Sequence, residues 1–252
     1  MGQGPSQEVY LETRVENPPD GREPQGLALI AHGRLGGNFD QPPVRLLADY
    51  LRDKRQLRVV TWNARGIGQS GGGNEWTDFS TWIGDPGIDD YRRMLRESMD
   101  RFVQDYPHIQ GAQLFICGYS AGAIFAGCSR PFPWFSQFRP AHYILVSYPV
   151  ELNPLIGIHK SGSYFRSVEA LVQGWGWENL PHEFNGKEPD VSGVLTVTGQ
   201  HEAMFYGMWT GILGSKNARG VLTQVVVDGA GHAWDDKAYR IPEEVDRWLS
   251  RF

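Results

Sequence analysis

The sequence predicts an α/β protein with a mostly parallel β-sheet between layers of helices. Short apolar runs, typical of strands buried on both faces, alternate along the chain with segments of helical spacing. This alternation favours right-handed strand–helix–strand units, because neighbouring parallel strands need a long crossover between them. A length of 252 residues, with 40% hydrophobic and 21% charged residues, is enough to fill a sizeable core.

The spacing of apolar residues predicts seven strands and four helices. The first strand alternates apolar and polar residues, as an edge strand does, and turn residues follow it. The expected strands are residues 8–15, 27–31, 57–62, 114–117, 144–147, 194–198 and 221–227. The expected helices are residues 44–51, a long amphipathic helix that begins at Asp85, the small-residue run 123–127, and residues 242–249.

One long stretch, residues 150–190, lies outside this alternation and is rich in Gly, Trp, Tyr and His. An insertion of about forty residues in a compact α/β domain is more typical of a lid than of a structureless loop. We therefore expect a single domain over residues 1–252 with a lid insertion at about 150–190.

Composition argues against several classes of function. A net charge of −5 argues against nucleic acid as a partner, two cysteines cannot form a disulfide framework, and no apolar run is long enough to span a membrane. The first residues lack a secretory signal; Gly2 and Ser6 fit a myristoylation pattern, but no second anchoring signal accompanies them. We expect a cytoplasmic monomer or homodimer that acts on a small molecule.

The pentapeptide Gly118-Tyr119-Ser120-Ala121-Gly122 lies between a predicted strand and a predicted helix. A serine at the apex of such a tight turn has strained backbone angles, so the positions two before and two after it must lack side chains. The two glycines meet that need, and the turn lifts the serine hydroxyl above the sheet. Ser120 is the predicted nucleophile.

A serine hydroxyl needs a general base, and a carboxylate has to orient that base. Among seven histidines we choose His232, because it follows the last predicted strand at the sheet edge where Ser120 also lies. For the acid we favour Glu202, which follows the strand 194–198 and gives the chain order Ser, Glu, His. Glu151, after the strand 144–147, is the alternative.

An oxyanion needs two backbone N–H donors. Ala121 follows the nucleophile and supplies one; Arg34, in the glycine-rich loop after the strand 27–31, is expected to supply the other, with Leu35 as the alternative. Aromatic residues gather in the lid and after Glu202, where they either line an apolar pocket or only pack the lid on the sheet. The expected substrate-binding residues are Tyr119, Leu35, Trp175, Trp177, Phe205 and Trp209.

Residues 66–71 spell G-x-G-x-x-G after a strand, a pattern that dinucleotide-binding proteins share. That function needs a helix to open directly from the glycines, whereas Gly72, Gly73 and Asn74 follow here. We therefore expect no dinucleotide cofactor at this loop.

With these segments in place, the sequence resembles the α/β-hydrolase superfamily over residues 8–252, and within it the small, short-lidded serine hydrolases of the dienelactone-hydrolase-like and short-chain esterase branch. The segments that carry the resemblance are His32-Gly33, residues 63–70, Gly118 to Gly122, Gly199 to Glu202 and Gly231-His232. It implies a sheet of about eight mostly parallel strands, no metal or cofactor, and Ser120, Glu202 and His232 as a catalytic triad with Ala121 and Arg34 as oxyanion donors. The chain departs from the common pattern in having Glu where Asp is commoner, and in its longer insertion.

The expected reaction is hydrolysis of an ester or thioester of a small hydrophobic or aromatic substrate through an acyl-enzyme on Ser120. The same triad is compatible with acyl transfer, cyclisation or cleavage of an activated carbon–carbon bond in a biosynthetic pathway. A non-catalytic ligand-binding protein of the same fold is the third hypothesis.

Overall fold

The structure is a computed structural model that describes residues 9–33, 37–72, 85–132, 134–148, 166–174, 191–202, 213–217 and 220–252. These residues form a seven-stranded sheet of order β1-β3-β2-β4-β5-β6-β7. Its strands are β1 (Thr13–Glu16), β2 (Gly26–Ala31), β3 (Arg58–Trp62), β4 (Gln113–Tyr119), β5 (Ala141–Val146), β6 (Val191–Gly199) and β7 (Leu222–Val227). Only β1 runs antiparallel to its neighbour, β3. The mostly parallel sheet is confirmed, with seven strands in the described part of the chain where the resemblance implied about eight.

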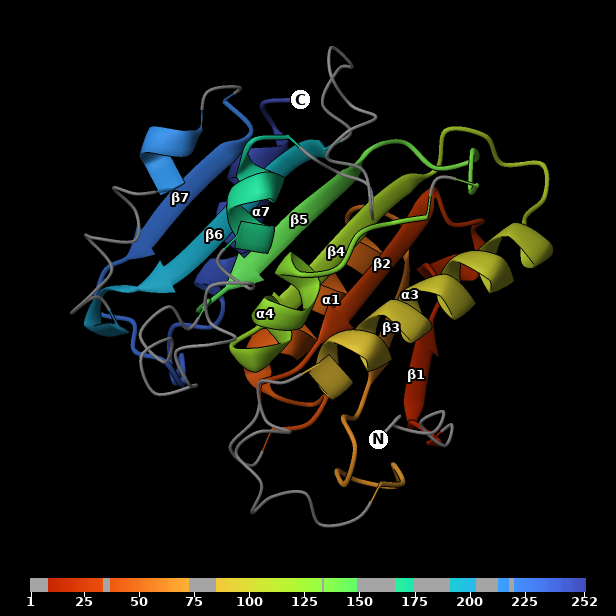
Figure 1. Cartoon of the computed structure of the whole chain (residues 1–252), viewed down its shortest axis with the longest axis horizontal. Coiled ribbons are helices and arrows are strands. Elements are labelled where there is room, and N and C mark those ends of the chain that lie inside the picture. Colours follow the sequence, from red (N-terminus) through yellow and green to blue (C-terminus); the bar gives the residue numbers. More distant parts are fainter. Residues whose placement is uncertain are drawn as a thin grey trace, which may run out of the picture.

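Helices cover both faces of the sheet (Figure 1). The long α3 (Asp85–Asp105) and the short α4 (Ala121–Gly127) lie on one face, and α1 (Pro42–Asp53) and α7 (Arg240–Leu249) lie on the other. Leu27 and Leu29 of β2 belong to the core beside α3, whereas Ala28 and Ile30 belong to the core beside α1 and α7. Because successive side chains of a strand point to opposite faces, a strand between two helical layers is apolar at every position.

The first strand is shorter than expected. The alternation of residues predicts a strand over residues 8–15, but β1 begins only at Thr13. The preceding backbone bonds to the loop after β3 instead of to a strand: Glu12 donates its N–H to Ser70 Oγ, and the Tyr10 carbonyl accepts the N–H of Gly71. The N-terminal segment therefore fixes that loop, which lies next to the site described below.

Part of the expected lid packs on the main core. Within residues 150–190 the structure describes only residues 166–174, which are helical over 166–172. Val168, Leu171 and Val172 are fully buried in the same core as α3 and α4. Arg130 also donates a hydrogen bond to the carbonyl of Ser167. The other residues of the expected lid lie outside the described part, so the domain organisation stays a prediction.

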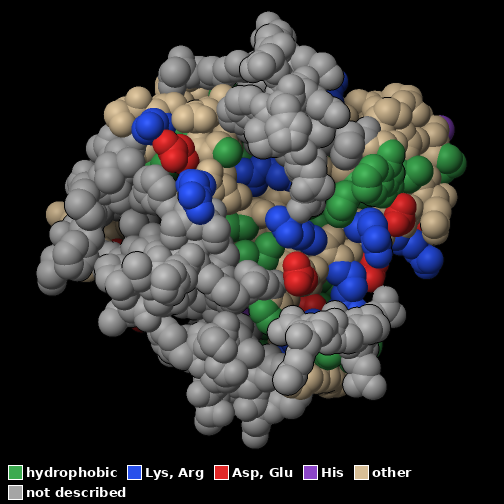
Figure 2. All heavy atoms as spheres, in the orientation of Figure 1, with side chains coloured by type: hydrophobic (Ala, Val, Ile, Leu, Met, Phe, Trp, Pro, Cys, Tyr) green, Lys and Arg blue, Asp and Glu red, His purple; other side chains and the backbone are tan. Residues whose placement is uncertain are grey.

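The exposed side of α3 carries charges of both signs. Figure 2 shows basic and acidic side chains next to one another among the described residues of this face. Arg93 lies near Glu97, and Arg101 near Asp105, one helical turn apart. None of the helices in the described ranges is both long enough and apolar enough to cross a membrane.

Candidate active site

Ser120 lies at the apex of a tight turn between β4 and α4. Its backbone has φ 54° and ψ −119°, a conformation that is strained for any residue other than glycine. The turn closes because its flanking glycines touch backbone: a Cβ on Gly118 would lie 2.0 Å from the Gly122 carbonyl oxygen, and one on Gly122 would lie 2.3 Å from that of Ala31. This geometry is that of a nucleophile elbow.

Ser120, His232 and Glu202 form a hydrogen-bonded chain. Ser120 Oγ lies 2.9 Å from His232 Nε2, and His232 Nδ1 lies 2.7 Å from Glu202 Oε2. A carboxylate accepts hydrogen bonds, so Nδ1 carries the imidazole proton and Nε2 is free to accept the proton of the serine hydroxyl. The imidazole is 45% exposed and the carboxylate 10%, so the imidazole is open to solvent while the carboxylate is covered.

Three donors surround the carboxylate of Glu202. Its Oε1 accepts the hydroxyl proton of Ser147 at 2.6 Å and the N–H of Gly199 at 2.9 Å, and its Oε2 faces His232. All of these partners can donate, and the two carboxylate oxygens accept from them. The short 3-10 helix η4 (Gln200–Glu202) directly after β6 brings the acid back to this position.

Tyr119 connects the nucleophile turn to the loop of the histidine. Its hydroxyl donates to the backbone carbonyl of His232 at 2.5 Å, and its ring lies 5.7 Å from the imidazole. Burial, together with the charge of Glu202, raises the pKa of Tyr119 well above its usual value, so the phenol keeps its proton. The hydroxyl therefore has a partner within the protein, and the substrate contact expected of Tyr119 stays a prediction.

The loop after β2 lies against the nucleophile. A Cβ on Gly33 would lie 3.0 Å from both the Ser120 Cβ and the Tyr119 ring, and the Gly33 N–H donates to Gln41 Oε1. Ala121 is the first residue of α4, where an N–H has no acceptor within the helix. Arg34 and Leu35, the two candidates for the second oxyanion donor, lie outside the described residues.

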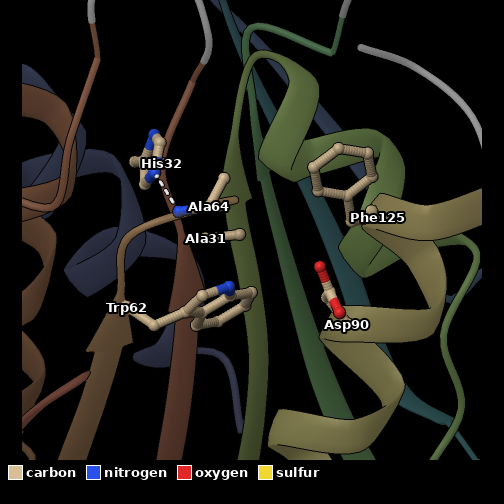
Figure 3. Close-up of a pocket in the computed structure, with 7 residues that line it drawn as sticks. Ala31, His32, Trp62, Ala64, Asp90 and Phe125 are labelled. Atoms are coloured by element: carbon tan, nitrogen blue, oxygen red, sulfur yellow. Dashed lines mark hydrogen bonds between the residues drawn. The ribbon is translucent and has the colours of Figure 1, made fainter. Parts of the chain in front are cut away.

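His32 joins this loop to the loop after β3. Its Nε2 accepts the N–H of Ala64 at 2.9 Å, and its Nδ1 lies 2.6 Å from the carbonyl oxygen of Gly33. Because a backbone N–H can only donate and a carbonyl can only accept, His32 is neutral with its proton on Nδ1. Figure 3 shows the hydrogen bond between His32 and the N–H of Ala64. It lies beside a small cavity that is also lined by Trp62 and by residues of α3 and α4.

The G-x-G-x-x-G loop is a compact turn whose amides bond to protein groups. Gly66 donates its N–H to the Gly71 carbonyl, and Gln69 donates to Glu12 Oε2. Arg65, next to the turn, makes two hydrogen bonds to the buried carboxylate of Asp90 on α3. These amides are therefore engaged by the protein itself. Among the residues that the structure describes, no group of three or more His, Cys, Asp or Glu side chains could hold a metal ion.

The structure thus brings Ser120, His232, Glu202 and Ala121 to one edge of the sheet. Six other residues of the expected site lie outside the described ranges: Arg34, Leu35, Trp175, Trp177, Phe205 and Trp209. The alternative acid, Glu151, also lies outside them. Ser147 and Trp234, which contact each other beside Glu202, were not anticipated from the sequence. Their signal was their position: Ser147 ends a predicted strand at the site's edge, and Trp234 is two residues beyond His232.

Comparison with solved structures agrees with this architecture. An α/β serine hydrolase homologue from Coxiella burnetii superposes with a TM-score of 0.62 and 18% identity, covering 98% of this chain and 100% of that one. Est1E from Butyrivibrio proteoclasticus, bound to ferulic acid, has a TM-score of 0.60 and 16% identity over 96% and 95% of the two chains. A dienelactone hydrolase from Anabaena variabilis has a TM-score of 0.55 and 15% identity over 98% and 94%.

No protein-family model and no curated protein sequence matches the chain. The likeness is one of structure over nearly the whole length of each chain, at identities that relate folds rather than activities. The protein has the α/β-hydrolase fold, as the sequence resemblance predicted.

Proposed function

We propose that the protein is a serine hydrolase that cleaves an ester or thioester of a small hydrophobic or aromatic substrate. The observation that carries this proposal is the hydrogen-bonded chain from Ser120 through His232 to Glu202, which starts on a strained elbow. Nucleophile, base and orienting acid within hydrogen-bond reach are what covalent catalysis by serine requires.

In the proposed reaction Ser120 Oγ attacks the substrate carbonyl while His232 Nε2 takes the hydroxyl proton. Glu202 keeps the imidazole in its Nδ1–H tautomer and stabilises the imidazolium. The N–H groups of Ala121 and Arg34 bind the oxyanion, and His232 then protonates the leaving group. Water, deprotonated by the same histidine, hydrolyses the acyl-enzyme and restores Ser120.

The substrate class is proposed from proteins of similar structure and from the aromatic residues of the sequence. A serine hydrolase homologue and an esterase are among the proteins of similar structure, and Est1E binds the aromatic ferulic acid. The aromatic side chains expected to bind substrate, Trp175, Trp177, Phe205 and Trp209, are of the type that would line an apolar pocket for such a group.

The test is hydrolysis of p-nitrophenyl esters of rising acyl chain length by the native protein and by Ser120→Ala. We expect turnover by the native protein, with a preference that reports the acyl pocket, and loss of turnover in the variant. Turnover that Ser120→Ala retains would remove the proposal. If an ester acylates the protein but water does not release the acyl group, an acyltransferase reaction is favoured over hydrolysis. Both reactions share the acyl-enzyme intermediate.

A further inference from the structure

Ser147 is buried directly behind the acid of the site. It follows the last residue of β5, has no exposed surface, and has a backbone φ of 48°. A serine keeps such a strained conformation only where its surroundings hold it, and strain of this kind gathers at functional sites. Five non-glycine residues of the described chain have positive φ, and three of them, Ser120, Ser147 and Trp234, belong to this site.

The hydrogen bonds of Ser147 have a defined direction. The indole of Trp234 can only donate, so Ser147 Oγ accepts its Nε1–H, at 2.7 Å. The hydroxyl proton of Ser147 is then directed to Glu202 Oε1, 2.6 Å away. The hydroxyl thus accepts a hydrogen bond from the buried indole and donates one to the carboxylate.

This arrangement fixes which way the carboxylate faces. Ser147 and the Gly199 N–H occupy Oε1, and Oε2 is left for the imidazole of His232. A glutamate has one more rotatable side-chain bond than an aspartate, so orienting it costs more conformational entropy. Trp234, only 1% exposed and two residues beyond His232, ties the same hydroxyl to the loop of the histidine.

We propose that Ser147 is a positioning residue of the active site, whose hydroxyl, held by Trp234, aims the carboxylate of Glu202 at His232. The inference rests on the proposed function, since it assigns Ser147 a role through the acid of that site. Ser147 acts through Glu202, because its side-chain hydrogen bonds are to Glu202 and Trp234.

The test compares the rate at which a fluorophosphonate labels Ser120 in the native protein and in three variants of Ser147. Ser147→Ala and Ser147→Gly both remove the hydroxyl, but only glycine adopts a φ of 48° without strain. We expect both to label about 10- to 100-fold more slowly, as loss of a hydrogen bond to a charged group predicts. Ser147→Cys, a weaker donor of similar size, should fall between them and the native protein.

Ser192→Ala is the matched control, because this serine lies at the opposite end of β6 and its hydroxyl donates only to the carbonyl of Pro140 among the described residues. It should label at the native rate. A second readout is the proton NMR resonance of His232 Nδ1–H, which a strong hydrogen bond to a carboxylate moves far downfield. We expect it to move upfield or vanish in the three Ser147 variants and to persist in the control.

The outcomes separate this inference from the proposed function. A native protein that never labels at Ser120 removes the proposed function itself. A native protein that labels, with Ser147→Ala and Ser147→Gly labelling at the same rate and keeping the downfield resonance, overturns the role of Ser147. If neither of these variants folds, Ser147→Cys decides in the same way.

Discussion

The phenolic oxygen of Tyr119 lies 2.5 Å from the backbone carbonyl oxygen of His232, to which it donates its proton. Tyr119 immediately precedes Ser120, so this one bond joins the turn of Ser120 to the loop of His232 across 113 positions of sequence. This bond therefore helps to hold Ser120 Oγ and His232 Nε2 at their separation of 2.9 Å.

Tyr119→Phe should lower both stability and reactivity. Removing the hydroxyl leaves the His232 carbonyl without this donor, which costs about 1 kcal/mol of the free energy of unfolding. A loss of similar size in the alignment of the base slows labelling of Ser120 about fivefold. Denaturant titration and the labelling rate check the two effects. Tyr10→Phe, at a side chain that is 66% exposed, is the control, and a Tyr119→Phe variant equal to it in both measurements contradicts the expectation.

Glu202→Gln tests the choice of acid. The amide cannot hold a negative charge beside the imidazolium, and it presents a donor where only an acceptor fits between Ser147, Gly199 and His232. We expect ester turnover to fall on the order of 10³- to 10⁴-fold, as when the acid of a triad is replaced by its amide. Glu151→Gln should keep most of the turnover. If the Glu151 variant loses turnover and the Glu202 variant keeps it, the assignment is reversed.

Gly122→Ala should prevent the elbow from closing. The added Cβ would lie 2.3 Å from the carbonyl oxygen of Ala31 in β2, and the backbone of a central strand has little room to move. We expect destabilisation of about 3 kcal/mol or more, measured by thermal or chemical unfolding. Gly214→Ala is the comparison, because nothing lies within 4 Å of its Cβ position. Equal stability of the two variants would show that the turn tolerates a side chain.

His142 should make stability depend on pH. Its ring stacks on Phe115 and contacts Trp248 and Phe252 edge-on, and burial, with a smaller effect from the charge of Arg55, lowers its pKa from 6.5 to about 4. The neutral imidazole is favoured in the folded state. Its contribution to the free energy of unfolding is therefore fully present above pH 6.5 and is lost as the pH falls toward 4. Between pH 6.5 and pH 4 the free energy of unfolding should fall by about 3 kcal/mol from this residue.

His142→Phe provides the measurement for that effect. Its free energy of unfolding should change less between pH 6.5 and 4 than that of the native protein, because a phenyl ring takes up no proton. Parallel pH curves for the two proteins would show that His142 does not contribute.

The sequence predicts the fold and the tight turn at Ser120 well, because both depend on local patterns. Leu27 to Ala31 is apolar at every position because two layers of helices cover β2, and Gly118 and Gly122 are needed by the turn itself. The base and the acid follow from strand ends, since parallel strands bring their carboxyl ends to one edge of the sheet.

The rest depends on side chains that meet only in the fold. Ser147 and Trp234 are 87 positions apart, and no local sequence pattern predicts the hydrogen bond between them. The short first strand has the same cause: residues before Thr13 alternate like a strand, but Ser70 and Gly71 take up their backbone hydrogen bonds. Contacts made in the folded protein decide whether such a segment becomes a strand, because the sequence pattern alone fits both outcomes.

The most direct test of the account is the intact mass of the protein after treatment with a fluorophosphonate, followed by peptide mapping. The account predicts one adduct, located on Ser120, which is absent from Ser120→Ala and forms much more slowly in His232→Ala. No adduct on the folded native protein, or an adduct that persists in Ser120→Ala, would contradict it.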